Sequence, residues 1–127
     1  MQAEVQFVLV DGAKSPLHQN AGWEVFPLAN SVIAPGERAV IRTGVIVAMP
    51  PGMYCRISPR TTREHGVDVL STIIDSDTRG EIEVVLFNHD ANEHFYVRRN
   101  LAMAQLIFQL LPNVVMRKYD ILDLGNP

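Results

Sequence analysis

Apolar and polar residues alternate along several short segments of the chain. The clearest case is residues 53–58, where every second position is apolar. Residues 5–9 and 81–86 show the same alternation, and β-branched apolar residues flank Gly44 within 39–47. A period of two places successive side chains on opposite faces of a strand. The pattern therefore predicts short β-strands, most of them with one face directed to a core.

Turn-forming residues separate these segments. Glycines and prolines recur from Gly12 to Pro112, and most intervals between them are too short for a helix of ordinary length. Residues 101–111 are ambiguous, because their apolar positions suit either a helix or a strand buried on both faces. The neighbouring strands favour a strand. A regular series of short strands separated by turns predicts an all-β sandwich or barrel.

Length and composition describe an ordinary globular protein. The chain has 127 residues and a mass of 14.2 kDa, with 47% hydrophobic and 20% charged residues. These values predict one domain over residues 1–127 and exclude disordered and collagen-like classes. No apolar run is long enough to span a bilayer, and the first residues do not resemble a signal peptide. We therefore predict an intracellular protein that does not associate with membranes.

Charge and cysteine content exclude several classes of binding site. The net charge of −3 argues against general nucleic-acid binding, which requires many basic contacts. Cys55 is the single cysteine, so an internal disulfide or a site with several cysteine ligands is excluded, and its position in the alternating segment predicts a core thiol. The four histidines lack the spacing of a metal site. The sequence therefore predicts no direct metal ligands.

Arginine is over-represented among the basic residues. Nine of the 11 basic residues are Arg, and five of these lie between residues 38 and 63: Arg38, Arg42, Arg56, Arg60 and Arg63. Arginine suits bidentate contacts with phosphate or carboxylate groups. Surface ion pairs with the 14 acidic residues are the simpler interpretation.

Residues 73–82 combine an apolar segment, a carboxylate and a turn. Two isoleucines lead directly into Asp75, a turn with Asp, Arg and Gly follows, and a second strand segment begins near Ile82. One interpretation is a hairpin whose aspartates cap its turn. The other is a carboxylate on a rigid hairpin, where it could position and deprotonate a water molecule. The spacing alone leaves both open.

Residues 74–82, with the sequence Ile-Asp-Ser-Asp-Thr-Arg-Gly-Glu-Ile, resemble the third motif of the homotrimeric deoxyuridine triphosphate nucleotidohydrolases (dUTPases). Residues 21–25 resemble the first motif of that family, residues 59–62 the second, and residues 104–107 the end of the fourth. The motifs occur in the same order as in the family, and the resemblance extends over nearly the whole chain.

This resemblance implies an all-β, jelly-roll-like fold and a homotrimer with active sites between subunits. It also implies Mg²⁺ held mainly by the triphosphate and water, and hydrolysis of dUTP to dUMP and pyrophosphate. Asp75 would position the attacking water, while Arg60, Thr61 and Gln105 would lie beside the phosphates. The backbone of residues 70–74 would recognise uracil.

The resemblance places further residues near the nucleoside. These are Leu70, Thr72, Ile74 and Thr78 in the nucleoside pocket, and Glu24 as the carboxylate of the first motif. Three of them differ from the usual family pattern, since Glu24 stands for Asp, Thr72 for Gly and Thr78 for the Tyr under the deoxyribose. Trp23 and residues 100–102 also differ from the family pattern.

A glycine-rich fifth motif, which closes over the nucleotide in the family, does not follow residue 124. Together with the substitutions, this predicts a degraded nucleotide site in a non-catalytic interaction or signalling module, with a host protein as partner. Residues 84–89 and 95–98 resemble strands of adenoviral dUTPase-derived adaptors. The alternative is an active, Mg²⁺-dependent dUTP diphosphatase whose arm is missing from this chain. Altered nucleotide specificity is a third possibility.

Overall fold

The computed structural model describes residues 3–59, 66–70 and 72–122, and every regular element in these ranges is a β-strand. No helix long and apolar enough to cross a bilayer occurs in this part of the chain. The strands are β1 (Gln6–Leu9), β2 (Leu17–Gln19), β3 (Gly22–Val25), β4 (Ser31–Ile33), β5 (Arg38–Ala48), β6 (Met53–Ser58), β7 (Val67–Val69), β8 (Thr72–Asp75), β9 (Glu81–Asn88), β10 (Phe95–Val97) and β11 (Ala104–Leu110). The predicted all-β class is confirmed.

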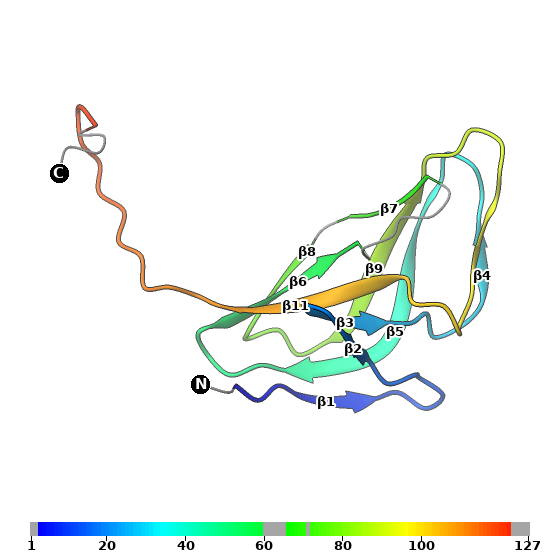
Figure 1. Ribbon diagram of the computed structural model, residues 1–127, viewed down its shortest axis with the longest axis horizontal. Helices are drawn as coiled ribbons and strands as arrows, with labels where there is room; N and C mark the ends of the chain where they lie inside the picture. The colour runs from blue at the N-terminus through cyan, green and yellow to red at the C-terminus, as the bar shows by residue number, and fades with distance from the viewer. Residues whose placement is uncertain (1–2, 60–65, 71, 123–127) are drawn as a thin grey trace.

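Two antiparallel sheets form the body of the molecule. One has four strands in the order β1-β5-β9-β7, and the other has five in the order β2-β3-β11-β6-β8. Strands β10 and β4 form a separate ribbon. Neighbours within each sheet are mostly distant in sequence, which gives the jelly-roll-like arrangement in Figure 1. The chain after β11 leaves the sheets in an extended path (Figure 1).

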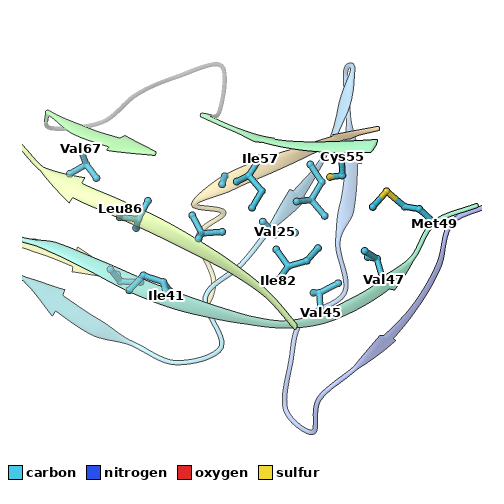
Figure 2. Close-up of a cluster of buried hydrophobic side chains, with 14 of the residues drawn as sticks. Val25, Ile41, Val45, Val47, Met49, Cys55, Ile57, Val67, Ile82 and Leu86 are labelled. Atoms are coloured by element: carbon cyan, nitrogen blue, oxygen red, sulfur yellow. The ribbon is translucent and has the colours of Figure 1, made fainter. Parts of the chain in front are cut away.

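The core lies between the two sheets, where the predicted alternation holds best. In β6, Met53, Cys55 and Ile57 are buried, and in β9 the same is true of every second residue from Ile82 to Leu86. Figure 2 shows Cys55 and Ile57 on the side of the core opposite Ile82. Each fully buried aliphatic side chain of this size contributes about 1.5–3 kcal/mol of transfer free energy.

Strand β1 departs from the prediction, because none of its residues is buried. Phe7 remains 45% exposed and Leu9 40%. This strand lies at the edge of its sheet, pairing only with β5. Phe7 lines a cavity of about 820 Å³ with Trp23 and Phe108, so its inner face meets open space rather than packed side chains.

Strand β11 settles the ambiguous segment as a strand. It lies between β3 and β6, with Ala104 and Leu106 buried and Ile107 half-buried on the other face. The central position of β11 gives it neighbours on both edges. These ladder partners on both edges, together with the burial of alternate residues Ala104 and Leu106, identify the segment as a strand rather than a helix.

The predicted hairpin around Asp75 is wrong. Strand β8 pairs with β6 in the five-stranded sheet, whereas β9 pairs with β5 and β7 in the four-stranded sheet. Residues 76–80 therefore pass from one sheet to the other. Local alternation identifies strands but does not reveal which distant strand each of them pairs with.

Candidate functional site

Asp75 is the last residue of β8, the edge strand of the five-stranded sheet. Its Cα partner on β6 is Tyr54, and its side chain is exposed. The Asp75 carbonyl accepts a hydrogen bond from the Thr78 amide at 3.1 Å, which closes the turn that follows. The sheet thus fixes the backbone of Asp75 and leaves the carboxylate open to solvent or a ligand.

Arg79 organises the same turn. Its guanidinium Nη1 donates to the carbonyl oxygens of Ser76, at 2.5 Å, and Thr78, at 2.9 Å. These contacts use side-chain donors to satisfy carbonyl groups that no strand partner reaches. The turn after Asp75 is therefore internally bonded.

Gln105 lies in the middle of the same sheet. It pairs with Glu24 of β3 on one side and with Ser58 of β6 on the other. Its Nε2 donates to the Pro59 carbonyl at 2.8 Å, which ties β11 to the residue that follows β6. The carboxylate of the first motif and the glutamine of the fourth motif are therefore neighbours in one row.

Gly22 makes this arrangement possible. A Cβ atom at residue 22 would lie 2.8 Å from Gln105 Oε1 and 3.0 Å from the Leu106 carbonyl oxygen. The glutamine oxygen ends a flexible side chain that would have to move aside, and the Leu106 carbonyl, which is backbone, would have to yield by a few tenths of an ångström. Glycine at this position allows the backbone of β3 to approach the glutamine side chain closely.

Two predicted phosphate contacts, Arg60 and Thr61, lie outside the described residues. The described chain resumes at Gly66 and reaches Leu70, whose amide donates to the Val85 carbonyl at 2.9 Å. Strand β7 belongs to the four-stranded sheet and β8 to the other sheet. The described residues of the segment proposed to recognise the base are therefore Leu70, bonded to the four-stranded sheet, and residues 72–74 in the other sheet.

The remaining predicted pocket residues lie in β8 or in the turn after it. Thr72 lies opposite Ile57, and Ile74 packs against the core while remaining half-buried. Thr78 is exposed in the turn beyond Asp75. Thr72 and Thr78 are thus exposed, whereas the side chain of Ile74 packs against the core.

The strand register gives the separation of Asp75 and Gln105 within one chain. Asp75 pairs with Tyr54, whereas Gln105 pairs with Ser58, and these partners are four residues apart on β6. At about 3.3 Å per residue, the two rows are separated by about 13 Å along the strand. Asp75 and Gln105 also flank β6 on opposite sides. A single chain therefore does not bring them to one phosphate group.

Cys55 does not contribute chemistry to this region. Its side chain is fully buried in the core, and burial raises the pKa of the thiol to about 12. A thiol in that state is a poor nucleophile near neutral pH. The prediction of a core thiol is confirmed.

Metal-binding side chains do not cluster in the described part of the chain. No group of three or more His, Cys, Asp or Glu residues there could hold an ion. The arrangement of donors does not suit an all-protein metal cage.

Comparisons with known proteins agree with one another. The family model for dUTPase matches residues 13–123. Deoxyuridine 5'-triphosphate nucleotidohydrolase of Mus musculus is 34% identical over 127 residues, covering 95% of this chain and 78% of the mouse protein. The protein of the same name from Fowlpox virus is 32% identical and covers 99% of this chain and 94% of its own length.

Solved structures show the same fold. The Staphylococcus bacteriophage 80alpha dUTPase superposes with a TM-score of 0.83 at 18% identity, covering 94% of this chain and 98% of the phage chain. A mutant dUTPase of phage phi11 superposes with a TM-score of 0.81 at 18% identity, covering 94% of this chain and 99% of the phage chain. That structure describes the coordination of a structural Mg(II) ion.

Proposed function

The chain belongs to the dUTPase family, and we propose that it hydrolyses dUTP to dUMP and pyrophosphate. The observation that carries the proposal is the position of Asp75. It is an exposed carboxylate at the end of a paired strand, in the segment that resembles the third motif. Relatives that align over almost the whole chain are named for this reaction.

The prediction of a non-catalytic interaction module is wrong. Relatives with 32–34% identity over 95–99% of the chain are dUTP nucleotidohydrolases, which favours the enzymatic alternative. The substitutions at Glu24, Thr72 and Thr78 leave the carboxylate at Asp75 and the amide at Gln105 in place. The adaptor role and the host partner rested on the same prediction and have no support from these relatives.

Asp75 is proposed to position the water that attacks the α-phosphate and to accept its proton. A carboxylate suits this role when it is exposed to the substrate and its backbone is fixed, since general-base catalysis depends first on geometry. Arg60, Thr61 and Gln105 are proposed to lie beside the phosphates, where charged and polar donors stabilise negative charge. Gln105 is anchored to Pro59, the residue immediately before Arg60.

The nucleoside is proposed to bind near Leu70, Thr72, Ile74 and Thr78. Strand β8 is the edge of its sheet, so the backbone groups on its side away from β6 have no strand partner among the described residues and are available to hydrogen-bond a planar base. Glu24 supplies the carboxylate of the first motif next to Gln105.

A homotrimer is proposed to complete the active site. The Asp75 row and the Gln105 row are about 13 Å apart along β6 in one chain, too far for both to act on the same phosphate group. In a trimer with sites at the subunit interfaces, Asp75 of one subunit would face the Gln105 region of a neighbour. The distance within one chain is what supports this assembly.

Mg²⁺ is proposed to bind with the nucleotide. When bound, it would neutralise and orient the phosphate oxygens, which lowers the cost of charge development. The open position of Asp75 and the absence of a ligand cluster in the described residues fit an ion held largely by substrate and water.

The experiment is a pyrophosphate-release assay on the purified chain with dUTP and Mg²⁺, beside dCTP and UTP. The proposal expects turnover with dUTP that falls when Mg²⁺ is chelated. A trimeric mass by light scattering is expected in the same preparation. Turnover no faster than in buffer, at micromolar enzyme, would contradict the proposed activity.

A further inference from the structure

Arg42 and Glu81 form a two-pronged ion pair between β5 and β9. The Arg42 Nε donates to Glu81 Oε2 at 3.0 Å, and Nη2 donates to Oε1 at 2.8 Å. The Gly44 amide adds a third contact to Glu81 Oε2 at 3.2 Å. One carboxylate therefore joins two points of β5 that are two residues apart, and parallel donation of this kind restricts geometry more than a single contact does.

The ion pair spans an irregularity in the sheet. The regular partner of Arg42 is Glu83, and the pairing of β5 with β9 shifts between Arg42 and Ile46. Gly44 lies within the shift with a φ of 73°, and a Cβ atom there would lie 2.5 Å from the Cβ of Ala13. Bulges bend a strand and redirect its neighbours. Glu81 lies on the far side of this shift, where the ladder resumes with Ile46 as its partner, and the Arg42 contact bridges the shifted stretch.

A buried hydrogen bond gives β5 and β9 a further contact beside the ion pair. The Thr43 Oγ1 donates to the Ile82 carbonyl at 2.7 Å and accepts from the Val45 amide at 3.0 Å. Side chains on β5 therefore hold both Glu81 and Ile82, the first two residues of β9.

Glu81 is also the residue at which the turn after Asp75 ends and β9 begins. Within that turn, Arg79 bonds two carbonyl groups, and the Thr78 amide bonds the Asp75 carbonyl. Residues 76–80 connect the two sheets. Strand β8 fixes the start of this connection, and the contacts of Glu81 fix its end. The backbone of Asp75 is held by its pairing with Tyr54 and by the hydrogen bond from the Thr78 amide, so a shift of the turn reaches Asp75 through that hydrogen bond.

We propose that Arg42 and Glu81 act as a positioning clamp that sets the orientation of the Asp75 carboxylate. This inference rests on the proposed role of Asp75 in dUTP hydrolysis. The clamp fixes the turn on the four-stranded sheet, while β8 fixes it on the other sheet. Loss of the clamp lets the turn and the carboxylate shift, and small displacements of a catalytic group lower the rate of the chemical step.

The test is Glu81→Gln with Glu83→Gln as the matched control. Both variants remove one negative charge from β9 near Arg42, but only Glu81 receives its hydrogen bonds. We expect kcat to fall about 10-fold in Glu81→Gln with KM changed by less than about twofold, and no change above about twofold in Glu83→Gln. Equal effects of the two variants, or an unchanged kcat in Glu81→Gln, would overturn the clamp.

A double-mutant cycle shows whether the two residues act as a unit. Arg42→Ala is expected to lower kcat to the same extent as Glu81→Gln, and the double variant is expected to be no slower than either single variant. Multiplicative losses in the double variant would show that the residues act independently. The assays are run well below the unfolding temperature of every variant, so that loss of folded protein does not imitate a loss of kcat.

Amide hydrogen exchange separates failure of the clamp from failure of the proposed function. The Thr78 amide is expected to exchange about 10-fold faster in Glu81→Gln, whereas the Leu106 amide of β11 keeps its rate. If wild-type protein shows no dUTP turnover, the proposed function fails, and an unchanged Thr78 rate then overturns the clamp while a faster rate supports it. In an active enzyme, the kcat result decides.

Discussion

The Gln105 region and the Asp75 region belong to one sheet, but they are held in different ways. Gln105 lies on a central strand, with Glu24 and Ser58 as ladder partners on its two sides. Asp75 ends an edge strand, and the chain beyond it crosses to the other sheet. The ladder fixes the first region, whereas the second depends also on side-chain contacts from Arg79 and Glu81.

This difference indicates where each region is vulnerable. A central strand tolerates loss of a surface side chain, but it has no room for added atoms where backbones approach closely. A turn between sheets has room, but it loses its position when the few contacts that hold it are removed. The following changes test this contrast, beginning with the largest expected effect.

Asp75→Asn is expected to lower kcat for dUTP by about 10²–10⁴-fold, because the amide cannot accept the proton of the attacking water. The side chain is exposed, so the unfolding temperature should change little. Steady-state kinetics and a thermal melt measure the two effects. Asp77→Asn, an exposed residue of the same turn, is the control and should retain activity within about twofold. Similar losses in the two variants would remove the special role of Asp75.

Gly22→Ala is expected to destabilise the fold by about 1–3 kcal/mol, as other cases of overpacking do. The new Cβ would meet Gln105 Oε1 at 2.8 Å and the Leu106 backbone at 3.0 Å, and moving Gln105 should also lower kcat/KM. Chemical denaturation measures the stability. Gly80→Ala, in the Asp75 region, has open space around the added atom and should change stability by less than about 0.5 kcal/mol. If both variants behave alike, the two regions do not differ in packing as described.

The smallest expected effect is the pH dependence of the Arg42–Glu81 pair. Hydrogen bonds from Arg42 lower the pKa of the Glu81 carboxyl below its usual value of 4.5. A lowered pKa in the folded state stabilises the protein above pH 4.5, and this stabilisation is lost as the pH falls through the lowered value. The difference in unfolding midpoint between wild type and Glu81→Gln should therefore shrink from pH 7 towards pH 3.

The side chain of Arg42 is 56% exposed, so solvent screens the pair and the difference should be small even at pH 7. A difference between wild type and Glu81→Gln that grows as the pH falls would contradict the assigned pKa direction.

Much of the fold could be predicted from the sequence because the core strands alternate. Residues 53–58 and 81–86 bury the predicted faces, since each packs against the opposite sheet. Residues 6–9 show a similar pattern but stay exposed, because β1 is an edge strand beside a cavity. Alternation states which residues share a face, and tertiary structure decides whether that face is covered.

The site was predictable only in part. The carboxylate at Asp75 could be singled out because it ends an apolar segment, and its assignment came from the resemblance to a motif. The hydrogen bond from Gln105 to Pro59 joins residues 46 positions apart, and Arg42 and Glu81 are 39 positions apart. No local pattern contains such pairs. In the sequence Arg42 is one of several arginines, and the segments on either side of the Asp75 turn resemble a hairpin, although β8 and β9 pair in different sheets.

The central claim is that Asp75 and the phosphate-binding residues act on one substrate from different subunits. Subunit complementation tests it most directly. Asp75→Asn and Arg60→Ala would each be purified, shown to be inactive and trimeric, then unfolded together and refolded as a mixture. Mixed trimers should contain some sites with an intact Asp75 from one chain and an intact Arg60 from another, so activity should rise well above that of either variant refolded alone. If each chain forms its own complete site, the mixture will stay as inactive as its components, and the account is contradicted.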